Sequence, residues 1–230
     1  MKILRPTMIL LVLSFLTTYA GFAQDWPGLR HFVAENKKLA PPAPDEDRVV
    51  FMGNSITIGW IQARPDFFNE NPFINRGISG QTTPQMLVRF RQDVLDLHPK
   101  VVVILAGTND IAGNTGPSTL EMIVDNIKSM AQLAEANGIK VIISSVLPAF
   151  DYPWKPGLRP NEKIPALNEL LKDYANANGF LYLDYFSALV DDRNGLPKKY
   201  ADDGVHPTAE GYAIMEPLVE AAIAKSLHKN

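Results

Sequence analysis

The chain has 230 residues, of which 22 are basic and 25 acidic, and it contains no cysteine. The near balance of charge gives no electrostatic footprint for nucleic acid or for an anionic membrane, so a small or neutral ligand is the expected partner. The lack of cysteine excludes disulfides, thiolate metal sites and a lipid anchor on cysteine.

The first 23 residues have the pattern of a cleaved export signal. Residues 1–5 carry two positive charges, and residues 8–22 are almost wholly apolar or small. Gly21 and Ala23 supply the small residues of a cleavage site, so the exported chain is expected to begin at Gln24. A membrane anchor is the alternative, but the apolar run is shorter than the roughly 20 residues of a spanning helix. We therefore predict a periplasmic or extracellular protein without a stable membrane anchor.

Residues 24–47 are expected to form a lead-in segment, because the prolines at 41, 42 and 44 prevent a continuous helix. Trp26 and Phe32 of this segment are candidates to pack on the body of the protein. The rest of the chain, 48–230, is expected to form one domain. Five apolar runs in it predict strands of a parallel sheet that is buried on both faces. They are residues 48–52, 73–75, 101–105, 140–146 and 180–183.

Helical patterns separate these predicted strands. One apolar stripe follows Thr83-Pro84, a pair that suits a helix start, and two later stripes end at Asn137-Gly138 and Asn178-Gly179, which suit helix ends. A last helix is expected over 207–227, with a kink or a break at Pro217. This alternation predicts a three-layer α/β fold whose ligand crevice lies at the carboxyl ends of the strands.

Three small or polar residues follow the first three strands at that edge: Ser55, Gly80 and Asn109. Each has a structural interpretation, because Ser55 could cap a helix, Gly80 could occupy a turn with positive φ, and Asn109 could bond loop backbone groups. The functional interpretation is a serine nucleophile with a backbone N–H and a side-chain amide as oxyanion donors. A side chain at position 80 is then expected to obstruct the oxyanion.

A serine nucleophile needs a histidine base and a carboxylate that orients this base. The other histidines lie in the lead-in segment, at a turn before Pro99, and near the C-terminus. His206 alone follows the last strand with an acid at a short spacing, Asp203. Elimination makes His206 the candidate base, and the alternative is a helix cap beside a surface histidine.

These motifs, in this chain order, resemble those of the SGNH hydrolases, also called GDSL-like lipases and acylhydrolases. The resemblance spans about residues 48–230. It implies an α/β/α flavodoxin-like sandwich with a five-stranded parallel sheet in the order 2-1-3-4-5, and a mechanism that needs neither metal nor cofactor. It also implies the site residues, which are the triad Ser55, His206 and Asp203, and an oxyanion hole of the Ser55 N–H, the Gly80 N–H and the Asn109 side chain.

Two positions depart from the family pattern, in which an aspartate is common. Asn54 and Gln81 stand there, and each replaces a carboxylate by an amide. Neither is expected to carry a proton in the reaction. We expect the field at Ser55 to differ and the activity to be tuned or reduced.

The loop 148–160 contains Tyr152 and Trp154, whose aromatic faces suit a sugar ring, although Trp154 could instead anchor its own loop. Because no long apolar lid is evident, we predict an exported esterase that removes a short acyl group, such as acetyl, from a carbohydrate. A lysophospholipase or thioesterase is the first alternative, and a glycan-binding module that has lost turnover is the second. A flavin-binding flavodoxin is disfavoured, because the Ser55 loop lacks the hydroxyl and glycine residues that cradle phosphate.

Overall fold

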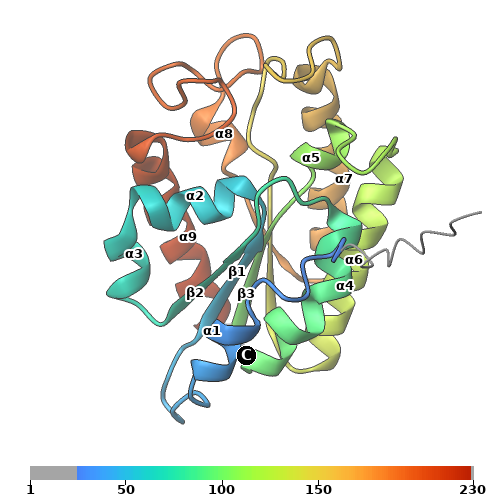
Figure 1. Cartoon of the computed structure of the whole chain (residues 1–230). Helices are drawn as coiled ribbons and strands as arrows, with labels where there is room; N and C mark the ends of the chain where they lie inside the picture. Colours follow the sequence, from blue (N-terminus) through green and yellow to red (C-terminus); the bar gives the residue numbers. More distant parts are fainter. Residues whose placement is uncertain (1–24, 229–230) are drawn as a thin grey trace, which may run out of the picture.

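The structure is a computed structural model that describes residues 25–228, so the predicted export signal lies outside the described residues. Five parallel strands form one sheet in the order β2-β1-β3-β4-β5 (Figure 1), as predicted. The strands are β1 (Val49–Gly53), β2 (Phe73–Gly77), β3 (Val101–Leu105), β4 (Lys140–Ser144) and β5 (Leu181–Leu183).

Helices cover both faces of the sheet. The first part of the chain contributes α1 (Val33–Lys38), α2 (Ser55–Ala63), α3 (Pro65–Asn69), α4 (Thr83–Asp93) and a 3-10 turn, η1 (Leu95–Leu97). The second part contributes α5 (Thr108–Ile111), α6 (Leu120–Ala136), α7 (Pro160–Ala177), α8 (Phe186–Leu189) and α9 (Ala209–His228). No helix within residues 25–228 is long and apolar enough to span a membrane.

Two apolar cores lie on the two faces, because alternate residues of a strand point in opposite directions. Val50 and Met52 of β1 pack with α4, α6 and α7. Val49 and Phe51 pack with α2, α3 and α9 on the other face. The central strands β1 and β3 are buried throughout, which explains why their sequences are apolar without alternation.

The register brings three loops to one edge of the sheet. The last residue of β1, Gly53, pairs with Gly77 at the end of β2 and with Leu105 at the end of β3. The loops that follow these strands therefore start at the same level. They carry Ser55, Gly80 and Asn109 to the predicted crevice.

Pro217 predicts a kink or a break in the last helix, but the helix does not break there. α9 runs without interruption from Ala209 to His228. A proline in a helix leaves the carbonyl four residues earlier without its donor, here that of Ala213. Pro217 and Ala213 are both exposed, so water can reach this carbonyl.

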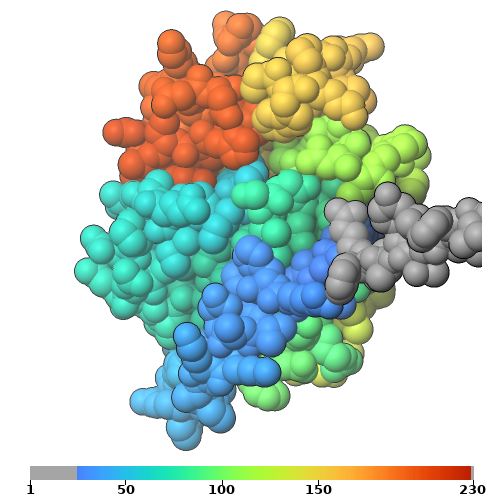
Figure 2. Space-filling model, in the orientation of Figure 1, coloured from blue at the N-terminus to red at the C-terminus, as the bar shows by residue number. Residues whose placement is uncertain are grey.

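The lead-in segment lies across the outside of the sheet edge and α4, as the blue surface in Figure 2 shows. Phe32 is buried, and its ring lies 4.6 Å from the guanidinium carbon of Arg76. Trp26, the other aromatic residue expected to pack, remains 43% exposed. The start of the segment is held instead by hydrogen bonds to its backbone, such as the bond from Gln85 to the Trp26 carbonyl at 2.5 Å.

Candidate active site

Ser55, His206 and Asp203 form a hydrogen-bonded chain at the carboxyl edge of the sheet. The Oγ atom of Ser55 lies 2.9 Å from Nε2 of His206, although the two residues are 151 positions apart. Nδ1 of His206 lies 2.7 Å from Oδ2 of Asp203. An Nδ1–H that donates to the carboxylate leaves the lone pair of Nε2 directed at the serine hydroxyl. This tautomer can accept the proton of Ser55.

The Asp203 carboxylate also stabilises the turn that carries His206. Its Oδ1 accepts from the backbone N–H groups of Val205, at 2.9 Å, and His206, at 2.8 Å. Partial burial raises the pKa of Asp203, but the bonds from His206 and Val205 outweigh it and leave this pKa below its ordinary value. The carboxylate is therefore ionised at neutral pH, as an acceptor for Nδ1–H must be.

Ser55 is the first residue of α2, where its side chain projects from a tight strand-to-helix turn. Asn54 caps this helix, because its Oδ1 accepts from the Ile56 N–H at 3.0 Å. An amide oxygen makes this bond as a carboxylate does, so the asparagine preserves the turn. Gly53 and Gly77 let the backbones approach, since a Cβ on Gly77 would lie 2.3 Å from the Ile58 nitrogen.

The three residues expected to donate to an oxyanion, Ser55, Gly80 and Asn109, follow the aligned ends of β1, β2 and β3. Neither the Ser55 nor the Gly80 backbone N–H has an acceptor among residues 25–228. Asn109 is buried and donates one Nδ2 hydrogen to the Gln81 carbonyl at 2.9 Å, which leaves its other hydrogen available. Free donors of this kind suit a developing oxyanion.

Gly80 is required by its backbone conformation and not by lack of space. Its φ is +77°, a value that favours glycine, and a Cβ would meet nothing closer than 4.0 Å. A Cβ at this position would therefore meet no close protein atom, and that it would obstruct a bound oxyanion stays a prediction.

Arg89, a buried cation beside the loop of Gly80, is a residue that the sequence patterns do not indicate. It donates to Gln81 Oε1 at 2.6 Å and to the carbonyls of Gly53, at 3.1 Å, and Arg76, at 2.9 Å, and it pairs with Asp93 at 3.1 Å. Burial lowers the pKa of Arg89 to about 10, and the Asp93 carboxylate opposes this shift. Arg89 thus links the ends of β1 and β2 to the residue after Gly80.

Asp110 fixes the loop of Asn109 to the start of α4. Its carboxylate accepts from the Thr83 N–H, at 3.0 Å, and from the Thr83 hydroxyl, at 2.6 Å. Burial raises the pKa of Asp110 to about 6, against the lowering effect of the Thr83 bonds. The motif after β3 contained this residue, but only the structure shows its partner.

The two aromatic residues proposed to touch substrate differ in exposure. Tyr152 is fully buried, and its hydroxyl lies 2.9 Å from that of Thr108. Trp154 stacks on the Tyr152 ring at 5.2 Å, remains 45% exposed, and lies 5.9 Å from the His206 ring, measured between ring centres. Trp154 can therefore offer a face to a ligand beside the histidine, whereas Tyr152 supports it from beneath.

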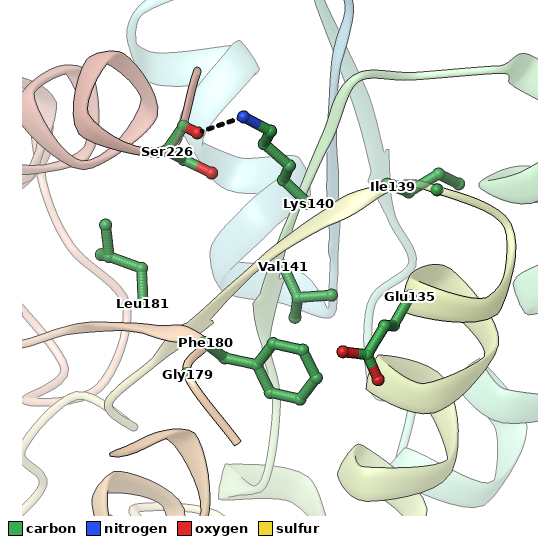
Figure 3. Close-up of a pocket in the computed structure, with 9 residues that line it drawn as sticks. Glu135, Ile139, Lys140, Val141, Gly179, Phe180, Leu181 and Ser226 are labelled. Carbon is green, nitrogen blue, oxygen red and sulfur yellow. Dashed lines mark hydrogen bonds between the residues drawn. The ribbon is translucent and has the colours of Figure 1, made fainter. Parts of the chain in front are cut away.

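A separate hollow of about 300 Å³ lies at the other end of the sheet (Figure 3). It is lined by the starts of β4 and β5, and Lys140 there donates to the Ser226 carbonyl at 2.9 Å. The strands run from this end toward Ser55, so this hollow is not part of the candidate active site.

Comparison with known proteins gives a consistent picture of the family. The model of the GDSL-like lipase/acylhydrolase family matches residues 51–214. The crystal structure of a GDSL-like lipase from Bacteroides thetaiotaomicron is similar, with a TM-score of 0.85 and 49% identity over 87% of this chain and 98% of that one.

Two curated relatives are named as esterases. An acetylxylan esterase from Xylanibacter ruminicola is 29% identical over 79% of this chain and 44% of its own length, so the chain spans less than half of this relative. An arylesterase from Vibrio mimicus is 25% identical over 84% of this chain and 94% of its own length.

Proposed function

Because the chain belongs to the GDSL-like lipase and acylhydrolase family, and hence to a family of hydrolases that act on esters, we propose that it is an exported serine esterase. Its substrate is a carbohydrate that carries a short acyl group, such as acetyl. The hydrogen-bonded chain from Ser55 through His206 to Asp203 is the observation that carries this proposal. Export rests on the charge and apolar pattern of residues 1–23.

In the first half of the reaction, the Ser55 oxygen attacks the ester carbonyl carbon while His206 Nε2 takes the hydroxyl proton. Asp203 holds the resulting imidazolium through Nδ1–H. The negative charge on the carbonyl oxygen is met by the N–H groups of Ser55 and Gly80 and by the Asn109 amide. The intermediate then collapses, the bond to the alcohol oxygen breaks, and His206 gives its proton to that oxygen. The alcohol leaves, and the acyl group stays on Ser55.

Water completes the cycle by the same steps. His206 removes a proton from a water molecule as its oxygen attacks the acyl carbon, and the same oxyanion donors stabilise the second intermediate. Collapse breaks the bond to the Ser55 oxygen, which regains its proton from His206. The products are the free acid and the unchanged enzyme.

The surroundings of the site support a polar alcohol and a short acyl group. In the loop that follows β4, two large apolar side chains are exposed, Phe150 and Trp154, fewer than would line a long apolar groove. A long acyl chain would need such a groove. The named activity of the acetylxylan esterase relative supports acetyl and a polysaccharide alcohol.

A labelling experiment tests the proposal. The purified protein should hydrolyse p-nitrophenyl acetate and react with a fluorophosphonate at Ser55, as mass spectrometry of the labelled peptide would show. Ser55→Ala should abolish labelling and lower kcat by at least about 10³-fold. Ser187→Ala, which changes an exposed serine on α8, should leave both signals as in the wild type. Turnover by Ser55→Ala at the wild-type rate would refute the proposed nucleophile.

A further inference from the structure

A second hollow, of about 370 Å³, adjoins the catalytic edge of the sheet. One wall is the loop between β4 and α7, with Phe150 and Tyr152, and the other is the segment before α9, with Arg193, Lys198 and Asp202. These are the yellow loop and the orange segment that lie at the top of Figure 1. The volume is within the range of small-molecule sites.

The wall of this hollow is continuous with the proposed reaction centre. Asp203 lines it and is bonded to His206, while Tyr152 lines it and carries the stacked ring of Trp154. Trp154 and His206 are themselves neighbours. A molecule that covers Trp154 can therefore extend past Asp203 into the hollow.

The proposed mechanism indicates which part of the substrate lies on this side. His206 must deliver its proton to the alcohol oxygen, so the alcohol has to lie on the His206 side of the carbonyl carbon. The oxyanion has to lie on the side of Gly80 and Asn109. The Trp154 face and the hollow beyond it are therefore placed for the alcohol portion of the ester.

The side chains of the hollow are suited to a neutral polyol. Phe150 is 48% exposed, and the Arg193 guanidinium lies 4.9 Å from its ring centre and pairs with Asp191. Lys198 and Asp202 have neither an ion pair nor a hydrogen bond to another of the described residues. Unpaired groups of both signs match hydroxyls, which donate and accept.

The carboxylates of the hollow disfavour an alcohol portion that carries a negative charge. The carboxylates of Asp151, Asp202 and Asp203 line the hollow together with its two cations. A phosphate ester, such as the headgroup of a lysophospholipid, would bring its negative charge against these carboxylates. A neutral sugar meets no such repulsion and can place an apolar ring face on an aromatic side chain.

From this arrangement we propose that the hollow is a subsite for a neutral sugar residue next to the acylated one, which itself lies on Trp154. The inference rests on the proposed esterase function and narrows its substrate to acylated oligosaccharides. The enzyme then prefers an acetylated trisaccharide to an acetylated monosaccharide, because only the longer substrate reaches Phe150 and Lys198.

Kinetics with three acetyl esters test this preference: monoacetylated methyl xyloside, monoacetylated xylotriose and p-nitrophenyl acetate. For the wild type, kcat/KM should be about tenfold higher for the trisaccharide than for the monosaccharide, which corresponds to one additional aromatic contact. Phe150→Ala and Lys198→Ala should each remove most of this ratio, chiefly through KM. Val88→Ala, which truncates a similarly exposed residue on α4, should preserve the ratio.

Binding separates failure of the subsite from failure of the esterase. Unacetylated xylotriose should bind the Ser55→Ala protein in calorimetry, and adding Phe150→Ala should weaken this binding about tenfold. Equal kcat/KM for the two sugar esters, or xylotriose binding that Phe150→Ala does not change, would overturn the subsite. Absence of p-nitrophenyl acetate turnover together with Phe150-dependent xylotriose binding would overturn the esterase and retain the sugar site.

Discussion

Asp110 combines burial with three hydrogen bonds from a single residue, Thr83. Its pKa of about 6 lies above the ordinary value of about 3.9 for aspartate, so the folded protein holds this proton more tightly than the unfolded chain. The free energy of unfolding should therefore decrease as the pH rises from about 4 to 6. At higher pH the free energy of unfolding no longer changes through Asp110, and the total decrease is on the order of 2–3 kcal/mol.

Asp110→Asn removes this titration and supplies a direct test. Urea unfolding of both proteins at several pH values would give the difference in free energy of unfolding, wild type minus variant. We expect this difference to decrease by about 2 kcal/mol between pH 4.5 and pH 7, because only the wild type loses stability in this range. Parallel pH profiles for the two proteins would show that Asp110 does not titrate in this window.

At the scale of elements, the strands and the principal helices could be predicted because their patterns are local. β1 and β3 are continuous apolar runs, and the stripes of α6 and α7 end in Asn-Gly pairs as expected. β2 is longer than predicted and reaches Gly77, because polar residues at its end are satisfied by partners far away in the chain. One of these is Arg76, which donates to the Asn36 side chain at 2.7 Å.

The site could be predicted in part for the same reason. The residues of the hydrogen-bonded chain stand in short motifs, and their spacing in the sequence is visible. Arg89 stands in no such motif, because its partners lie on β1, β2 and the loop after β2, and a cation in an amphipathic helix is usually exposed. Its burial follows from tertiary packing, which a single sequence does not specify.

Gln81 connects the lead-in segment to the loop that carries Gly80. Its Nε2 donates to the Pro27 carbonyl at 2.7 Å, while its Oε1 accepts from Arg89. Gln81→Glu keeps an acceptor for Arg89 but places a carboxylate oxygen against the Pro27 carbonyl. We expect the backbone amides of residues 25–32 to exchange their hydrogens faster. We also expect kcat for p-nitrophenyl acetate to be about tenfold lower, which is a smaller loss than removal of an oxyanion donor causes.

Gln92→Ala is the control, because Gln92 also donates to the lead-in segment, at the Leu29 carbonyl, and alanine places no charge beside Asp93. Water can replace that bond, so kcat should stay at the wild-type value and exchange should change only near residue 29. If both variants had the same kcat, the lead-in segment would have no influence on the Gly80 loop.

At the scale of the whole molecule, the proposed active site depends on the contact between α2, which begins with Ser55, and α9, which begins shortly after His206. The Tyr212 hydroxyl donates to the Ile56 carbonyl at 2.7 Å, and its ring stacks on Trp60 at 5.3 Å. One turn later, Glu216 accepts from Arg64 at 2.7 Å and from Trp60 at 3.3 Å. These contacts hold two helices from opposite ends of the chain at a fixed spacing.

Glu216→Ala should therefore affect both stability and catalysis. It leaves the Trp60 N–H and the Arg64 guanidinium without their acceptor, at a cost of about 1–3 kcal/mol in the free energy of unfolding, because Arg64 is partly exposed and can be hydrated. A shift of α9 would lengthen the distance from His206 to Ser55, so kcat should fall several-fold with KM unchanged.

Glu220→Ala, one turn further along on the exposed side of α9, should alter neither the free energy of unfolding nor kcat. Chemical unfolding and steady-state kinetics measure both, and a destabilised Glu216→Ala protein with wild-type kcat would mean that the triad geometry is set by the loop of Asp203 alone.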